Sequence, residues 1–137
     1  MTFITVPKAQ ESQKKGAIPD YVLNTQKKFV WVKFHNKVTV QDIARYATSL
    51  RRDPLFRPNF SEIVDMSEVE ELDLKAEEFI RLADEIDPFS EEARRAFVVK
   101  NEVQRHAARM HKILRTQRHF SIFDSVEEAW HWVLSAP

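Results

Sequence analysis

The sequence predicts an α/β fold, with a single central mixed sheet of about five strands flanked by about four helices. Short runs rich in aromatic and β-branched residues alternate with stretches whose apolar residues recur at helical spacing. The expected order of elements is β-β-α-β-α-β-α-β-α. Because single amphipathic helices separate most of the strands, the sheet is expected to have substantial parallel character. A length of 137 residues, 43% of them hydrophobic, fits one domain.

The start of the chain differs from the rest in composition. Residues 7–20 are mostly polar, include two prolines and the single glycine, Gly16, and have neither strand nor helical periodicity. Residues 1–20 are therefore expected to form a flexible N-terminal leader, and residues 21–137 the domain.

A hairpin and a helix are expected at the start of the domain. Residues 21–26 and 28–35 have strand composition, and the second run is apolar on both faces over part of its length, which favours a central strand. A helix is expected over residues 40–53, because Thr39 and Asp42 have the spacing of a capping box and a proline follows.

The remainder of the domain is expected to alternate strands and helices. Strands are predicted at 60–66, 95–99 and 118–123, and helices at 74–86, across 103–114 and from Ser125 onward. The acidic residues after Met66 are expected to form a loop, with Asp73 as the N-cap of the next helix. The third helix is expected to bury a stripe formed by Val103, Ala107, Met110, Ile113 and Leu114.

Composition excludes several classes of function. Lys and Arg number 21, as do Asp and Glu, so no overall positive field favours nucleic acid as a partner. The absence of cysteine excludes disulfides and thiolate metal sites and favours a cytoplasmic location. A single glycine leaves no glycine-rich phosphate loop, and no apolar run approaches the roughly 20 residues of a membrane span.

No pattern indicates catalysis, a cofactor or a metal. The five histidines form no metal-binding motif, and His106 and His111 are five residues apart, which turns them away from one shared helical face. Most carboxylates fall on polar helix faces or at helix starts, where solvation explains them. The serines lack a nucleophile-elbow motif. We therefore expect no catalytic residue, no cofactor and no metal site.

From residue 21 to residue 134, the chain resembles the SpoIIAA-like branch of the STAS family, best known for bacterial anti-sigma-factor antagonists. Six short segments carry the resemblance, and their order and spacing are more specific than any one of them: 36–39, 53–58, 63–67, 94–99, 108–110 and 123–132. The resemblance implies a regulatory or scaffold domain that binds a protein partner and catalyses no reaction.

One family feature is missing from the sequence. In phosphorylation-switched members, an Asp-Ser-Ser-Gly type motif opens the second helix, whereas residues 73–76 here read Asp-Leu-Lys-Ala. No hydroxyl stands where the phosphate would go, and Lys75 brings positive charge to a helix N-terminus, which favours negative charge. The usual phosphorylation switch is therefore expected to be absent.

The expected partner-binding surface surrounds the start of the second helix, with Ser67, Glu68, Asp73 and Lys75 as candidate residues. Ser67 follows a strand end, where open α/β sheets commonly bind ligands, but a hydroxyl there also serves as a turn residue. Basic residues gather between Arg94 and Arg118, after an acidic run. That separation of charge would suit an acidic partner, a phosphate-bearing ligand, self-association into a homodimer, or simply a soluble surface.

The resemblance also suggests an alternative function, because SpoIIAA-like domains are often compared with lipid carriers of the CRAL-TRIO type. In this alternative a lipid-like apolar molecule lies between sheet and helices, with Phe79, Met110 and Trp130 as candidate contacts. The same residues also fit an ordinary core. Trp132 and Phe89 fit no helical stripe, which is compatible either with a contact surface or with packing against the leader or a neighbouring loop.

Overall fold

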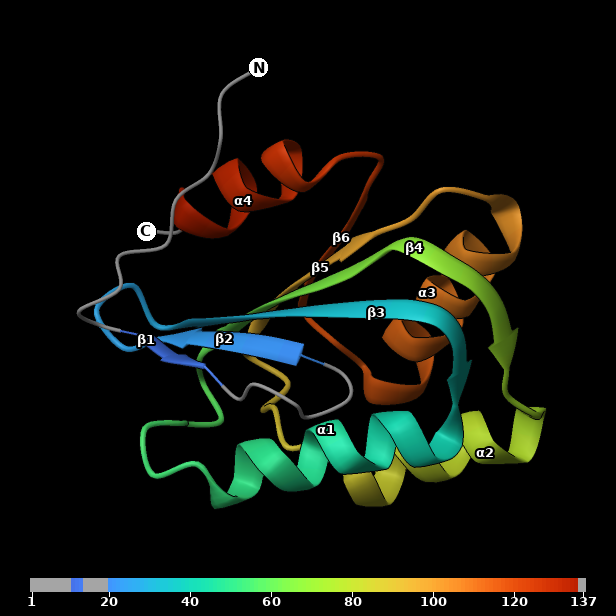
Figure 1. Ribbon diagram of the computed structural model, residues 1–137, viewed down its shortest axis with the longest axis horizontal. Coiled ribbons are helices and arrows are strands. Elements are labelled where there is room, and N and C mark those ends of the chain that lie inside the picture. The colour runs from blue at the N-terminus through green and yellow to red at the C-terminus, as the bar shows by residue number, and fades with distance from the viewer. Residues whose placement is uncertain (1–10, 14–19, 136–137) are drawn as a thin grey trace.

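The computed structural model describes residues 11–13 and 20–135, and it confirms the predicted fold class (Figure 1). Its mixed sheet has the strand order β1-β2-β3-β4-β5-β6. The strands are β1 (Glu11–Gln13), β2 (Asp20–Asn24), β3 (Phe29–Thr39), β4 (Ser61–Asp73), β5 (Arg94–Val98) and β6 (His119–Phe123). The strand β1 falls within the expected leader, whose residues 1–10 and 14–19 lie outside the described part of the chain.

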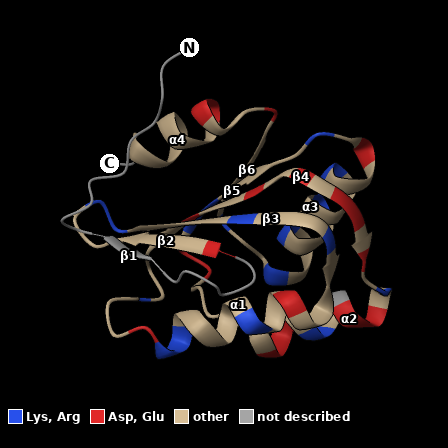
Figure 2. Cartoon of the chain, in the orientation of Figure 1, with Lys and Arg blue, Asp and Glu red and all other residues tan. Residues whose placement is uncertain are grey.

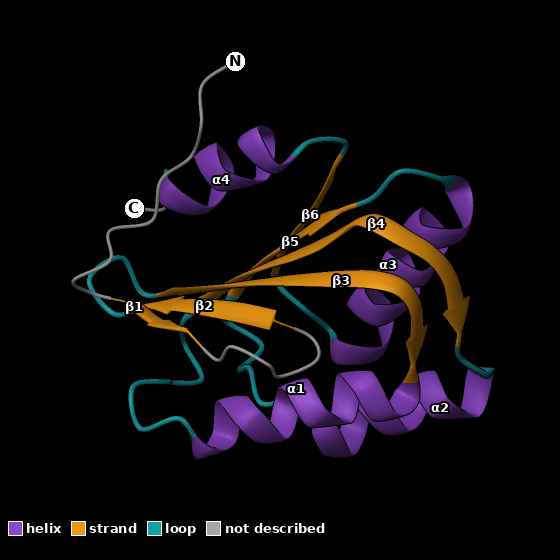
Figure 3. Ribbon diagram, viewed as in Figure 1, coloured by secondary structure: helices purple, strands orange, loops and turns teal. Residues whose placement is uncertain are grey.

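Helices cover both faces of the sheet. They are α1 (Val40–Arg52), α2 (Ala76–Arg81), which continues as the π-helix η2 (Leu82–Ile86), α3 (Glu102–Arg115) and α4 (Val126–Leu134). The first three helices lie on one face and α4 lies on the other (Figures 1 and 3). Strands β3 to β6 are parallel and adjacent in chain order. Right-handed crossovers that advance in one direction along a sheet place their helices on the same face.

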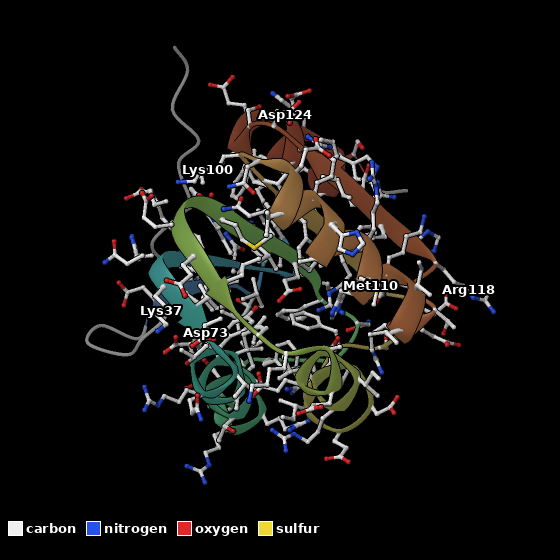
Figure 4. The ribbon with its side chains drawn as sticks, turned by 90° about the vertical axis from the view of Figure 1, so that its right-hand side faces the viewer. Lys37, Asp73, Lys100, Met110, Arg118 and Asp124 are labelled. Atoms are coloured by element: carbon white, nitrogen blue, oxygen red, sulfur yellow. The ribbon has the colours of Figure 1, made fainter. Side chains whose placement is uncertain are left out.

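Strand β4 is longer than predicted, and the expected loop after Met66 is wrong. The pairing of β4 with β5 ends at Asp65. Strand β4 then continues beside β3 as far as Asp73, which pairs with Thr39. Ion pairs across these two strands compensate the acidic residues: Glu68 with Lys33 and His35, and Asp73 with Lys37 at 3.4 Å (Figure 4). Opposite charges on facing strands stabilise strand pairing. The sequence of one strand does not show which residues of another strand lie opposite it, so this compensation was not predicted.

The predicted helix caps have different outcomes. At α1 the capping box is confirmed: the Asp42 N–H donates to Thr39 Oγ1 at 3.3 Å, and the Thr39 N–H donates to Asp42 Oδ2 at 2.9 Å. At α4, Ser125 is confirmed as the N-cap. The prediction of Asp73 as an N-cap is wrong, because Asp73 ends β4. Instead, the carboxylate of Glu78 accepts the Lys75 N–H at 2.8 Å.

The buried face of α3 also differs from the prediction. Val103 is 68% exposed and Ile113 is 69% exposed, whereas Gln104 and Ala108 are buried. Gln104 can be buried because its amide is satisfied: Nε2 donates to the carbonyl of Val69 at 3.1 Å, and Oε1 accepts the N–H of residue 100 at 2.9 Å. The buried face of α3 is therefore displaced by about one residue from the predicted apolar stripe. Residues 104, 108 and 111 lie on the side of the helix that faces the sheet.

The core has two layers, one on each face of the sheet. The larger lies beneath α1, η2 and α3 and includes Phe89, which is 2% exposed and therefore packs in the core. The smaller lies beneath α4, where the ring of Trp130 is 4.6 Å from that of Phe29. Trp132 packs against Phe123, with ring centroids 5.7 Å apart, and the guanidinium of Arg94 lies over it. Packing accounts for both aromatic residues that fitted no stripe.

Candidate functional site

The larger layer is not completely filled. A cavity of about 100 Å³, open to the surface, lies between the sheet and the helices α1, η2 and α3. Its wall is mainly apolar and is contributed by every element of this layer: Phe34, Val38, Ile43, Ala47, Val64, Met66, Leu72, Leu74, Leu82, Ile86, Pro88, Phe89, Phe97, Ala107 and Ala108. Native interiors are close-packed, so an apolar space of this size is a candidate binding site.

Charged groups form one part of the cavity wall. Arg95 on β5 donates from Nε to Glu62 Oε1 on β4 at 2.7 Å and from Nη1 to Asp87 Oδ2, after η2, at 2.9 Å. The hydroxyl of Tyr46 on α1 donates to Glu62 Oε2 at 2.6 Å. Arg95 and Glu62 are 3% and 1% exposed, so this ion pair is buried. We call Tyr46, Glu62, Asp87, Arg95 and the neighbouring His111 and Arg115 the charge cluster.

The carboxylate of Asp87 is the most crowded group in the charge cluster. Besides Arg95, its Oδ2 lies 3.2 Å from Arg115 Nε and 3.3 Å from His111 Nε2. Its Oδ1 accepts the N–H of Phe89 at 3.0 Å. Residues from β5, from α3 and from the loop after η2 therefore converge on one carboxylate.

Gln117 holds the Arg95 guanidinium through Nη1. Gln117 Oε1 accepts from Arg95 Nη1 at 3.0 Å, and Gln117 Nε2 lies within 2.9–3.1 Å of the carbonyls of Ser90, Glu91 and Ala93. The guanidinium also lies 4.4 Å from the ring centroid of Phe89. Arg95 is thus held in one orientation at the cavity wall.

The environment shifts the pKa values of three cluster residues. Burial by itself raises the pKa of Asp87, but the neighbouring Arg95 and His111 outweigh it and hold that pKa well below its usual range. Burial also raises the pKa of Tyr46, and the charge and hydrogen bond of Glu62 raise it further. For Arg95 burial lowers the pKa, but Glu62 and Asp87 raise it more strongly, so the guanidinium stays charged.

Burying charged groups costs folding free energy, so a functional reason for the charge cluster is worth seeking. Removing charged groups from water costs several kcal/mol per ion, and apolar residues of similar volume are often equally stable in their place. Perturbed ionisable groups that line a cavity are typical of functional sites. The charge cluster therefore marks this part of the cavity as its candidate polar end.

The expected partner-binding residues do not converge on the cavity. Ser67 and Glu68 are exposed within β4, Asp73 ends that strand, and Lys75 lies just before α2. The hydroxyl of Ser67 donates to Asp65 at 2.7 Å, a local contact of the kind expected for a turn residue. All four face outward along one continuous segment, whose Leu72 and Leu74 line the cavity.

The expected apolar-ligand residues lie elsewhere. Met110 is half-buried on α3 (Figure 4) and does not line the cavity. Trp130 lies on the opposite face of the sheet, beneath α4. Phe79 falls in α2, but its side chain lies outside the described part of the structure.

Sequence reasoning missed the charge cluster, although one signal was present. Glu62 directly precedes the apolar residues Ile63 and Val64 in one strand, and Arg95 directly precedes Ala96 and Phe97 in another. A charged residue inside an apolar strand is either at the surface or paired in the interior. Two such residues of opposite charge in parallel strands could have suggested a buried pair.

Comparison with known proteins identifies the class of fold. No family profile and no curated protein sequence matches the chain. Its architecture is that of a SpoIIAA-like domain. A solved structure with this fold is an uncharacterized protein from the DUF3478 family of Shewanella loihica: the TM-score is 0.52 at 18% sequence identity, covering 90% of this chain and 91% of that one. At this identity the likeness concerns the fold alone.

No described helix is both long and apolar enough to cross a membrane. Within the same residues, no group of three or more His, Asp or Glu side chains is arranged to hold a metal ion.

Proposed function

We propose that this chain is a non-enzymatic, STAS-like binding domain that holds a small apolar molecule between its sheet and helices α1, η2 and α3. The cavity carries the proposal, because it is open to the surface and its wall is mainly apolar. The π-helix η2, which contributes Leu82 and Ile86 to the wall, adds support, since π-helical turns recur at functional sites.

The bonding within the charge cluster supports binding rather than catalysis. A general base needs a carboxylate or imidazole within reach of substrate and with a pKa near the working pH. The carboxylates of Glu62 and Asp87 instead accept bonds from neighbouring side chains, and the lowered pKa of Asp87 makes it a weak base. Their arrangement is that of a fixed polar wall.

Filling the cavity tests this function. Ala107 lines the cavity, and Ala107→Phe is expected to weaken hexanol binding by about tenfold or more, because excess volume in a packed site costs about 1–3 kcal/mol. Met110→Phe introduces the same ring on the same helix away from the wall and is expected to retain the parent affinity. Titration followed by nuclear magnetic resonance measures both. Equal hexanol binding by the two variants would contradict the proposal.

A protein partner is the second candidate function, and the open edge of β4 supports it. Among the described residues, β5 pairs with β4 only from Glu62 to Asp65, while β4 continues beside β3 to Asp73. The extension exposes acidic side chains (Figure 2), although the Val69 carbonyl already accepts from Gln104 and Glu70 lies 3.5 Å from Lys100. An unpaired edge can accept a strand from another chain, and its charge suits a basic one.

Charge reversal on this edge separates the two candidates. The double variant Glu70→Lys/Glu71→Lys is expected to abolish recovery of a basic partner in affinity capture, because both residues are exposed on the extension. The control Asp84→Lys/Glu85→Lys makes the same change in charge at exposed positions of η2. If both variants recover the same partners, the edge of β4 is not the binding surface.

A further inference from the structure

The polar end of the cavity indicates which chemical class of ligand it would hold. We infer that the ligand is a compact amphipathic monocarboxylic acid, whose carboxylate lies against Arg95 and His111 and whose apolar part fills the rest of the cavity. This inference rests on the proposed small-molecule function and adds a head group to it.

Every carboxylate oxygen of the cluster already has a donor. Glu62 Oε1 accepts from Arg95 at 2.7 Å and Oε2 from Tyr46 at 2.6 Å. Asp87 Oδ1 accepts from the N–H of Phe89 at 3.0 Å, and Oδ2 accepts from Arg95 at 2.9 Å. A ligand that presented only donors, such as an ammonium group, would have to compete with these bonds.

Donor groups, by contrast, remain for a ligand. A guanidinium has five N–H groups. The bonds from Arg95 to Glu62, Asp87 and Gln117 use Nε and Nη1, and within the described part of the chain none is made by Nη2. His111 Nε2 lies 3.3 Å from Asp87 Oδ2 but makes no hydrogen bond within the described residues, and both ring nitrogens are donors when the imidazole is protonated. Both Arg95 and His111 line the cavity.

The charges of the cluster also favour an acid. Two carboxylates, Glu62 and Asp87, face two guanidiniums, Arg95 and Arg115, and Tyr46 is neutral. The balance is therefore even when His111 is neutral and positive when its imidazole is protonated. A bound carboxylate compensates the charge of the protonated form. A cationic head would add to the same excess.

The volume limits the size of the apolar part. The cavity measures about 100 Å³. An engineered apolar cavity of about 150 Å³ holds benzene. A short alkyl chain or a small ring is therefore the part of the ligand that the wall can enclose, and a longer chain would extend through the opening.

Three probes of matched chain length test the head group. Isothermal titration calorimetry is expected to give an affinity for hexanoate about tenfold or more above those for hexanol and hexylamine, as charge-assisted hydrogen bonds are about twice as strong as neutral ones. His111→Leu is expected to remove the advantage of hexanoate while hexanol still binds. Ala107→Phe is expected to weaken binding of all three.

The outcomes separate this inference from the function on which it rests. Equal affinities for hexanoate and hexanol, both weakened in Ala107→Phe, would overturn the head group and leave the apolar site in place. Preference for hexylamine would also overturn the head group. Absence of binding by all three probes would overturn both proposals.

Discussion

Arg95→Met is expected to lower the free energy of unfolding by about 3–5 kcal/mol, the cost of breaking a buried ion pair by removing one partner. Methionine retains much of the arginine stem, so the loss comes mainly from charge. Glu62 loses its bond to Nε at 2.7 Å, and Asp87 loses its bond to Nη1 at 2.9 Å. Because domains are stable by only about 5–15 kcal/mol, this loss is a large fraction of the total.

Urea unfolding measures this effect, and a surface arginine provides the control. Arg118 pairs with Glu92 at 3.2 Å, but its side chain is 65% exposed. Arg118→Met is therefore expected to cost no more than about 1 kcal/mol. The triple variant Arg95→Met/Glu62→Gln/Asp87→Asn is expected to recover part of the loss, since it leaves no unpaired buried charge. Similar losses in Arg95→Met and Arg118→Met would show that the buried pair has no special role in stability.

The elements predicted correctly are those whose signals are local in sequence. The capping residues Thr39 and Ser125 lie three residues before the groups they bond, so their role is visible within one turn. The hairpin of β2 and β3 likewise joins neighbouring runs of β-forming residues. Such patterns predict the order of elements without knowledge of the tertiary packing.

The features that were missed depend on contacts between distant segments. The acidic residues Glu68 and Asp73 suggested a loop, but β3 provides Lys33 and Lys37 opposite them. Gln104 falls outside the predicted apolar stripe of α3, and its bond to the carbonyl of Val69, 35 residues away, accounts for its burial. Periodicity identifies which residues are apolar, but it does not show which polar residues find partners in the interior.

The candidate site was predictable only in outline for the same reason. An apolar ligand between sheet and helices was the alternative that the family resemblance suggested, and a cavity exists there. Its polar residues were not predicted, because Glu62 and Arg95 are 33 positions apart and meet only through the pairing of β4 with β5. Choosing the ligand-contact residues by apolar character alone favoured Trp130, which packs under α4.

Acid sensitivity is the second large effect expected of the charge cluster. Arg95 and His111 hold the pKa of Asp87 below its usual range in the folded protein, against the effect of burial. In the unfolded chain an aspartate titrates near about 3.9. Below that pH the unfolded state binds more protons, so the contribution of Asp87 is fully present above about pH 5 and is lost as the pH falls toward its folded pKa. The loss should be of the order of 2 kcal/mol.

Asp87→Asn isolates this contribution. At neutral pH the variant is expected to be less stable than the parent, because the amide cannot compensate Arg95 and Arg115. As the pH falls toward about 3, Asp87 takes up a proton in the unfolded parent while it stays charged in the folded one. The parent therefore loses stability that Asp87→Asn does not, and the difference in urea midpoint should shrink. Glu68→Gln is the control, since Lys33 lowers the pKa of this exposed carboxylate and water screens the pair. A difference between parent and Asp87→Asn that stays constant from pH 7 to about 3 would mean that the Asp87 charge does not stabilise the fold.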